Sequence, residues 1–208
     1  VAKSLKILGI NKGDIVLMAM PTIPEMVYTF YALNRIGAIV DTIDPRIKSD
    51  RYKEIIEETN AKYLIALDLC QPIIEEFIQE EKLNKVILVS PTESLPLPVK
   101  MLLAMKEKKL KNKPNDKIID WSTFIKLGTY YEGVIDCEYE ENMPVVIVHT
   151  GGTTGTPKGV ILTNENFNTM AITQEISGFN SQEKDKFLTF LPPFIAYCLV
   201  NAIHDPLY

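Results

Sequence analysis

Short apolar runs alternate with helix-like segments through the first 90 residues, and this alternation constrains the fold more than any other feature. Between the runs, apolar side chains recur at helical spacing, as Met26, Phe30 and Leu33 do. Strands that alternate with helices form a mostly parallel sheet with helices on both faces, because each parallel connection must cross the sheet. We therefore predict an α/β fold with strands at 14–20, 38–43, 63–67 and 86–90 and helices at 2–8, 24–36, 50–59 and 72–80.

Capping residues indicate where several helices begin and end. Gly37 follows the helix predicted at 24–36, where a helix C-terminus favours glycine. Ser49 is the predicted N-cap of the helix at 50–59, and Asn60 its end. Asn164 is the predicted N-cap of a later helix that runs to about residue 176, and a further strand is predicted at 186–191.

A loop rich in glycine and threonine lies between two apolar runs at 144–148 and 160–162. The ten residues from Thr150 to Gly159 are four glycines, four threonines, Pro157 and Lys158. Glycine lets the backbone approach a ligand closely, and successive backbone N–H groups can form an anion site. Threonine hydroxyls can bind phosphate oxygens or Mg²⁺, and a lysine adds positive charge. Composition alone leaves two alternatives open, a phosphate-binding loop or a surface hairpin with an incidental lysine.

The spacing excludes two common phosphate-binding motifs. A Walker loop needs Gly-Lys-Ser/Thr in succession, whereas Lys158 follows Pro157 and precedes Gly159. A dinucleotide fingerprint needs G-x-G-x-x-G between a strand and a helix. Here the glycine spacing differs, and the element after the loop is predicted to be a strand.

The order Thr-Gly-Gly-Thr-Thr-Gly-Thr-Pro-Lys-Gly-Val from Thr150 resembles the signature loop of the adenylate-forming enzymes. These are the acyl-CoA synthetases, the luciferases and the adenylation domains of peptide synthetases. Their pattern is Ser/Thr-Gly-Ser/Thr-Thr-Gly-x-Pro-Lys-Gly, which Gly152 to Gly159 match without a gap. Gly151 stands where many members carry serine, which removes one hydroxyl from the loop.

Shorter matches to the same family flank the loop. Gly13-Asp14-x-Val16, then residues 37–40 and Asp44-Pro45, precede it in the family's order. After it, Leu191-Pro192-Pro193-Phe194 resembles a Leu-Pro-x-Phe/Tyr-His motif that helps line the acyl pocket in relatives. Ile195 stands where that motif commonly has histidine, so an acyl-substrate assignment that depends on the histidine does not transfer. The resemblance covers most of the chain.

The resemblance implies part of the large N-terminal domain of an acyl-adenylate-forming enzyme. Residues 1–90 would form an α/β unit, 91–142 an insertion and connector, and 143–208 the loop's strand pair with the following helix and strand. Because the chain starts at Val1 and ends in an apolar run, we expect a piece of a longer protein. The family's Tyr-Gly-x-Thr-Glu motif and C-terminal lysine domain would then lie outside it, and the catalytic residues with them.

The implied reaction is ATP-dependent activation of a carboxylic acid, with a fatty acid as the expected class, to acyl-AMP, followed by transfer to coenzyme A. ATP, Mg²⁺ and coenzyme A are the implied cofactors and co-substrate. The threonines would contact phosphate, the glycines would shape the loop, and the lysine would neutralise phosphate charge. The implied ATP-binding residues are Thr150, Gly151, Gly152, Thr153, Thr154, Gly155, Thr156 and Lys158, with Thr150 also a candidate Mg²⁺ ligand. Two alternatives stay open: a non-catalytic nucleotide- or phosphate-binding module, and an adenylation domain that loads a carrier protein.

Composition bounds the partners. A net charge of −5 gives no electrostatic case for binding nucleic acid. Cys70, Cys137 and Cys198 are widely spaced and odd in number, which favours unpaired thiols in a reducing cytosol and predicts a cytoplasmic protein. Residues 187–203 carry no charge, but they are too few to span a bilayer and contain two prolines, so a buried strand and helix start are predicted there.

Residues 91–119 differ from the rest because they are rich in proline and lysine. Met101, Leu102, Leu103 and Met105 suggest a short amphipathic helix. A basic amphipathic helix can lie on a membrane surface. A solvated surface insertion is the favoured interpretation, because the chain as a whole is acidic; peripheral membrane contact is the alternative. The sequence makes no prediction of oligomeric state.

Overall fold

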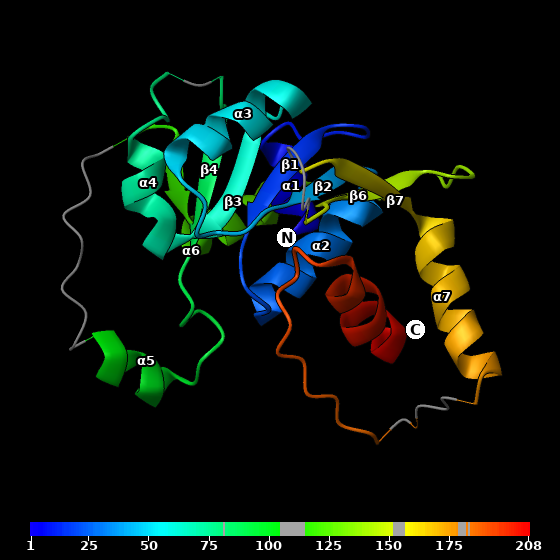
Figure 1. The fold of residues 1–208 in the computed structure, drawn as a ribbon. Helices are drawn as coiled ribbons and strands as arrows, with labels where there is room; N and C mark the ends of the chain where they lie inside the picture. The colour runs from blue at the N-terminus through cyan, green and yellow to red at the C-terminus, as the bar shows by residue number, and fades with distance from the viewer. Residues whose placement is uncertain (81, 105–114, 152–156, 179–181, 183) are drawn as a thin grey trace.

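A seven-stranded sheet forms the centre of the protein in the computed structural model, which describes residues 1–80, 82–104, 115–151, 157–178, 182 and 184–208 (Figure 1). The strand order is β5-β4-β3-β1-β2-β6-β7, with parallel pairing from β5 to β6 and antiparallel pairing of β7 with β6. The predicted α/β class with a mostly parallel sheet is confirmed. The strands are β1 Ile15–Ala19, β2 Ile39–Thr42, β3 Tyr63–Leu67, β4 Lys85–Val89, β5 Ile118–Asp120, β6 Pro144–His149 and β7 Gly159–Thr163.

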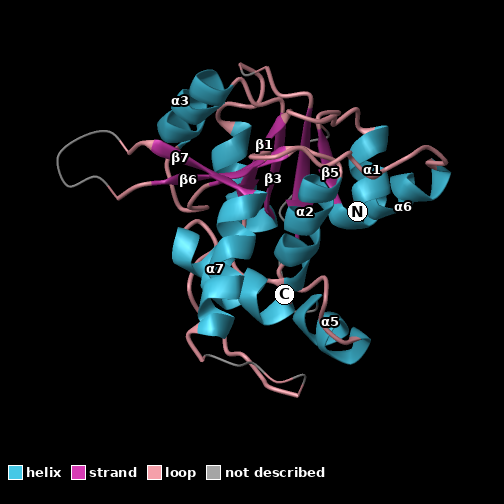
Figure 2. Cartoon of the chain, turned by 90° about the vertical axis from the view of Figure 1, so that its right-hand side faces the viewer, coloured by secondary structure: helices cyan, strands magenta, loops and turns pink. Residues whose placement is uncertain are grey.

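Helices cover both faces of the sheet. The α-helices are α1 Ala2–Ile7, α2 Pro24–Arg35, α3 Ser49–Thr59, α4 Gln71–Glu75, α5 Leu97–Ala104, α6 Trp121–Leu127 and α7 Asn164–Ile176. A π-helix, Cys198–His204, and three 3₁₀ turns, Asp68–Cys70, Gly128–Tyr130 and Asp205–Leu207, complete the described helical segments. Figure 2 shows α3 above the sheet, with α2 and α7 below it.

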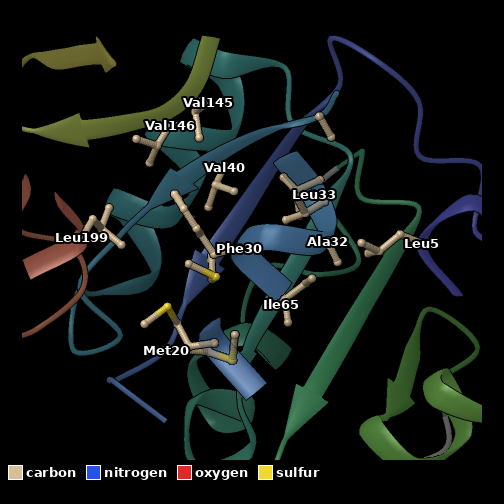
Figure 3. Close-up of a cluster of buried hydrophobic side chains, with 14 of the residues drawn as sticks. Leu5, Met20, Phe30, Ala32, Leu33, Val40, Ile65, Val145, Val146 and Leu199 are labelled. Atoms are coloured by element: carbon tan, nitrogen blue, oxygen red, sulfur yellow. The ribbon is translucent and has the colours of Figure 1, made fainter. Parts of the chain in front are cut away.

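One core cluster packs α1, α2, α6, α7 and the π-helix against the first face of the sheet. Phe30 and Leu33 of α2, each at most 2% exposed, lie in it with Val40 of β2 and Ile65 of β3 (Figure 3). A second cluster packs α3 and α4 against the opposite face, where Tyr52 of α3 is fully buried. Strand residues therefore alternate between two apolar layers, which explains why the parallel strands are almost continuously apolar.

The chain reverses its direction of winding after β2. The connection from β1 through α2 leads to the neighbouring strand β2, whereas the connection through α3 leads back across β1 to β3. Because α2 and α3 cover opposite faces, the chain leaves the carboxyl ends of β1 and β2 in opposite directions. In parallel α/β sheets, ligands bind in the crevice that forms at such a point.

Several predicted boundaries are corrected by the structure. Ser49 is the first residue of α3 and Lys48 its N-cap; Asn60, in the left-handed conformation with φ 52°, ends the helix as predicted. Thr163, not Asn164, caps α7, because its side chain and that of Asn166 form a reciprocal capping box. The helix predicted at 72–80 is the shorter α4, followed by turns.

The strand predicted at 186–191 is wrong. These residues have irregular backbone, and Leu188 and Phe190 are 87% and 81% exposed. An apolar run forms a strand only where another strand offers hydrogen-bonding partners, and the described part of the chain supplies none here. The following prediction of a buried helix is confirmed, since Cys198, Leu199 and Ile203 of the π-helix are buried.

Residues 91–142 contribute to the sheet, which their composition did not predict. β5 pairs in parallel with β4, and α6 inserts Phe124, which is fully buried, into the first core cluster. Asp120 caps α6: burial would raise the pKa of its carboxyl, but hydrogen bonds from Ser122 and Thr123 outweigh burial and lower it to about 2.

A helix, α5, is present where a short amphipathic helix was predicted; its amphipathic character stays a prediction, and Met105 lies outside the described residues. Leu97, Val99 and Leu102 on α5 are exposed. Solvated insertion and membrane contact both stay predictions. Across the described parts of the chain, no helix combines the length and the apolar character needed to cross a membrane.

Candidate phosphate-loop site

The predicted loop emerges from the hairpin of β6 and β7. His149 is paired with Gly159 in the antiparallel ladder. One step further, the Thr150 N–H donates to the Lys158 carbonyl at 2.9 Å, and the Lys158 N–H donates to Thr150 Oγ1 at 3.2 Å. The two ends of the loop are therefore held together by backbone and side-chain hydrogen bonds, as in a hairpin.

The structure describes three of the eight predicted ATP-binding residues. Thr150, Gly151 and Lys158 are exposed at the mouth of the loop, and a Cβ built on Gly151 would meet no atom within 4 Å. Gly152, Thr153, Thr154, Gly155 and Thr156 lie outside the described residues, so the predictions made for them stay predictions. So does the prediction of Thr150 as a magnesium ligand.

Gly159 keeps the base of the hairpin tightly packed. A Cβ at this position would lie 2.9 Å from Cγ2 of Ile147 and 4.0 Å from Cε1 of His149. The first of these distances is too short for a real contact, so a larger residue would push β7 away from β6. The glycine of the loop's last position thus has a steric role in addition to the conformational one predicted from the sequence.

A cavity of about 250 Å³ lies beside the loop at the carboxyl edge of the sheet. β2 and β6 are neighbouring parallel strands, so the segments that follow them meet at this edge. Most of the lining is apolar, with charge from Asp44 and Arg51. The lining residues are Thr42, Ile43, Asp44, Ile47, Arg51, Ile55, His149, Pro157 and Phe194.

The Leu191–Phe194 segment is brought to the same edge. Thr22, which follows β1, donates its hydroxyl to the Leu191 carbonyl at 2.8 Å, and Cys198 Sγ donates to the same carbonyl at 3.0 Å. Phe194 lines the cavity together with Pro157 of the loop. Two motifs that the sequence analysis singled out separately are therefore neighbours in the folded chain.

A buried Asp–His pair lies directly under the loop, and the sequence analysis missed it. Nε2 of His149, the last residue of β6, lies 2.8 Å from Oδ1 of Asp41, which is fully buried in β2. The second carboxyl oxygen of Asp41 and Nδ1 of His149 are also buried, and neither has a hydrogen-bond partner among the described residues. The signal in the sequence was an acidic residue, Asp41, directly after the apolar residues Ile39 and Val40 of the predicted strand.

The described residues fit a polyphosphate group. The exposed Lys158 provides positive charge, Thr150 provides a hydroxyl, and the open space at Gly151 lets a ligand approach the backbone. For Mg²⁺ the described loop offers the Thr150 hydroxyl oxygen, which suits a cation that keeps most of its ligands as water and phosphate oxygen.

The second histidine, His204, joins helices instead of lining the cavity. Its Nδ1 lies 3.1 Å from the hydroxyl of Tyr31 on α2, and its Nε2 lies 3.1 Å from Oδ1 of Asn168 on α7. Its ring also meets that of Phe167 edge-on, with centroids 5.4 Å apart. Burial lowers the pKa of His204 below its ordinary value of 6.5, although Asp205 opposes the shift, and burial raises the pKa of Tyr31 to about 12.

We expect His204 to make folding sensitive to acid. Its pKa is lower in the folded than in the unfolded chain, so the unfolded chain binds more protons as the pH falls below about 6.5. The stability gained from the neutral ring is therefore present above that pH and is lost as the pH falls through the lowered pKa. Urea unfolding of the wild type and of His204→Gln should be compared between about pH 7.5 and pH 5.5. The free energy of unfolding of the wild type should fall relative to that of the variant as the pH is lowered. A pH-independent difference between the two proteins would contradict this assignment.

Comparisons with known proteins agree with the loop and the fold. The sequence matches the AMP-binding enzyme family over residues 1–207. It is 27% identical over 205 residues to the long-chain-fatty-acid–CoA ligase of Bacillus subtilis, covering 94% of this chain and 36% of the relative. It is 30% identical over 209 residues to 4-coumarate–CoA ligase CCL1 of Humulus lupulus, covering 98% and 33%.

A solved structure has a similar fold. It is the anthranilate CoA ligase AuaEII in complex with anthranoyl-AMP, with a TM-score of 0.77 and 19% identity over all of this chain and 36% of that one. The chain thus spans about a third of the length of these relatives. With the loop, the parallel sheet and the family match in agreement, this chain belongs to the AMP-binding enzyme family.

Proposed function

We propose that this chain forms part of the N-terminal domain of an acid–CoA ligase, in which the loop from Thr150 to Gly159 binds the phosphates of ATP. The observation that carries the proposal is the position of the loop's base. Its hairpin base opens beside a cavity at the carboxyl edge of the sheet, next to the point where the winding reverses. The proposal gives the loop, the cavity and the Leu191–Phe194 segment one common ligand.

The proposed reaction has two steps. A carboxylate oxygen of the acid attacks the α-phosphorus of ATP, the bond to the bridging oxygen breaks, and pyrophosphate leaves with the electron pair. The thiolate of coenzyme A then attacks the acyl carbon and AMP leaves, which gives a thioester. Adenylation is needed because a free carboxylate has no good leaving group. Bound Mg²⁺ would supply charge neutralisation for the phosphates.

The residues of the loop would act by position and charge. Lys158 would face the negative charge that collects on the leaving pyrophosphate, where a fixed cation stabilises the transition state. The threonine hydroxyls, Thr150 among them, would donate hydrogen bonds to phosphate oxygens. Pro157 restricts the backbone next to Lys158, so less conformational entropy is lost when the loop closes on its ligand.

The substrate is proposed at the level of the relatives. A long-chain-fatty-acid–CoA ligase and 4-coumarate–CoA ligases are among them, so a fatty acid and an aromatic acid are both candidates. Phe194 and the apolar lining of the cavity suit either acid. A cytoplasmic location stays a prediction; Cys70, Cys137 and Cys198 are free, and burial raises the pKa of Cys70 and of Cys198.

ATP–pyrophosphate exchange tests the proposed function. A polypeptide of the relatives' length that carries this sequence is expected to exchange labelled pyrophosphate into ATP in the presence of a suitable acid. A panel of fatty, aromatic and short-chain acids would identify the acid. Exchange with an acid but no thioester with coenzyme A would favour the carrier-protein alternative. No exchange with any acid, together with calorimetric ATP binding, would favour the non-catalytic module.

The 208-residue chain by itself is expected to form no adenylate and to bind ATP more weakly than millimolar. It would supply the phosphate loop but not the segments that relatives of three times its length carry. Calorimetry and pyrophosphate exchange on the chain alone check this expectation. Adenylate formation by the chain, or millimolar or tighter binding, would contradict it.

A further inference from the structure

The buried Asp41–His149 pair has a cost that packing does not explain. Asp41 is 0% exposed in the middle strand of β1, β2 and β6, in register with Leu17 on one side and Ile147 on the other. A buried carboxylate is expensive unless it is paired and hydrogen-bonded. An apolar side chain would fill this place in the sheet at no such cost.

The partner of Asp41 is the residue from which the loop starts. His149 pairs with Gly159 at the last rung before the loop, and the next residue, Thr150, makes the hydrogen bonds to Lys158 that close the loop's base. The 2.8 Å contact therefore ties the loop's base to β2 by a side chain, in addition to the backbone ladder between β6 and β2.

The chemistry of the pair fixes the orientation of the imidazole. A carboxylate accepts hydrogen bonds, so His149 donates from Nε2 to Oδ1 of Asp41. The ring lines the cavity on the α3 side, and its Nδ1 is buried without a partner among the described residues. The ring is thus held from one side by Asp41, with its other nitrogen free to hydrogen-bond.

We propose that Asp41 is a positioning residue that holds His149, and through it the first residues of the loop, in the geometry that binds the polyphosphate of ATP. The inference rests on the proposed function. A buried polar pair is weak evidence for stability, and in some proteins such a pair fixes a unique geometry instead. Displacement of a binding group by about 1 Å can cost a factor of about 100 in rate. The role of Asp41 is indirect, because its contact is with His149.

Kinetics of the ligase-length protein test the proposal. Asp41→Val and His149→Phe are each expected to lower kcat/KM for ATP about tenfold to a hundredfold. For Asp41→Val, whose side chain is not among the residues that line the cavity, the KM for the acid should stay near the wild-type value. His149→Gln, whose amide can still donate to Asp41, should retain more activity than His149→Phe. The double variant Asp41→Val/His149→Phe should be no worse than either single one, because both remove the same contact.

Tyr31→Phe is the matched control. It removes the hydroxyl that contacts the other histidine, His204, at 3.1 Å, in a part-buried pair on the opposite face of the sheet. It should lower thermal stability and leave kcat/KM for ATP unchanged. If Tyr31→Phe and Asp41→Val lower kcat/KM equally, or if the effects of Asp41→Val and His149→Phe simply add, the proposed positioning role is wrong.

NMR supplies a readout that does not depend on activity. Ring ¹⁵N spectra of the ligase-length protein contain one set of signals for each histidine, and the set that is missing from the spectrum of His149→Phe belongs to His149. His149 is expected to carry its proton on Nε2 in the wild type and to lose that signature in Asp41→Val. If the ring signals of His149 are the same in the wild type and in Asp41→Val, the inference is wrong.

The two proposals can fail separately. If the wild-type protein exchanges pyrophosphate and the Asp41 and His149 variants match its kcat/KM, the positioning role falls and the proposed function stands. If the wild type performs no exchange while the NMR signature is present, the proposed function falls, and the positioning role in ATP binding falls with it.

Discussion

Replacing Lys158 with alanine is expected to lower the rate of ATP–pyrophosphate exchange by about 10²–10³-fold in the ligase-length protein, because removing one fixed stabilising group at a developing charge has an effect of that order. Lys158 is exposed at the mouth of the loop, and its backbone is hydrogen-bonded to Thr150 on the opposite side. Its backbone is therefore held at the base of the loop, while its side chain is exposed. The loss should appear mainly in kcat, because negative charge on pyrophosphate grows as the bond to it breaks.

Lys126 offers the control for this experiment. It is an exposed lysine in the last turn of α6 and lies in another part of the fold. Lys126→Ala has the same change in net charge, so it separates a local effect at the loop from a general effect of charge. Wild-type exchange by Lys158→Ala would contradict the assignment of the loop, and an equal loss in both variants would show that net charge matters instead.

Replacing Phe124 with alanine is expected to lower the free energy of unfolding by about 3–5 kcal/mol, the cost usual for removing a buried phenylalanine. Phe124 is fully buried in the first core cluster, and its ring lies 5.2 Å from that of Trp121. The test matters because its helix, α6, lies in the stretch predicted from sequence to be an insertion and connector. A large loss would show that this stretch is part of the folding unit.

Ile125→Ala is the neighbouring control. Ile125 is 37% exposed on the same helix, so its truncation removes less buried apolar surface while changing the helix similarly. Urea unfolding of both variants measures the difference. If Phe124→Ala is no more destabilising than Ile125→Ala, residues 121–127 form an appendage and not part of the core.

The sequence predicted those features that depend on neighbouring residues. Helical spacing in residues 24–35 and continuous apolar runs in β1, β3 and β6 reflect which side chains must be buried, and this can be read from local order. The loop was predicted for the same reason, since its glycines, threonines and lysine lie at fixed spacing along the chain. The residues that lie next to it in the fold, Asp41 among them, were not predicted.

The errors share a physical cause. The run at 186–191 is apolar, but strand formation also needs a hydrogen-bonding edge, which is a property of the sheet and not of the run. β5 was missed because its three residues become a strand through their pairing with β4. Thr163 was missed as a cap because the capping box depends on where β7 ends.

By itself, the sequence determined the class of fold and the position in the chain of the glycine- and threonine-rich loop, because periodicity and spacing are local. The tertiary structure alone decided which strands became neighbours. By placing β2 beside β6, the strand order brought Asp41 to His149, and the tertiary fold placed Phe194 and Pro157 on the lining of one cavity. Both arrangements join residues more than 30 positions apart. They arise from the burial of both sheet faces at once, which no single stretch of the chain encodes.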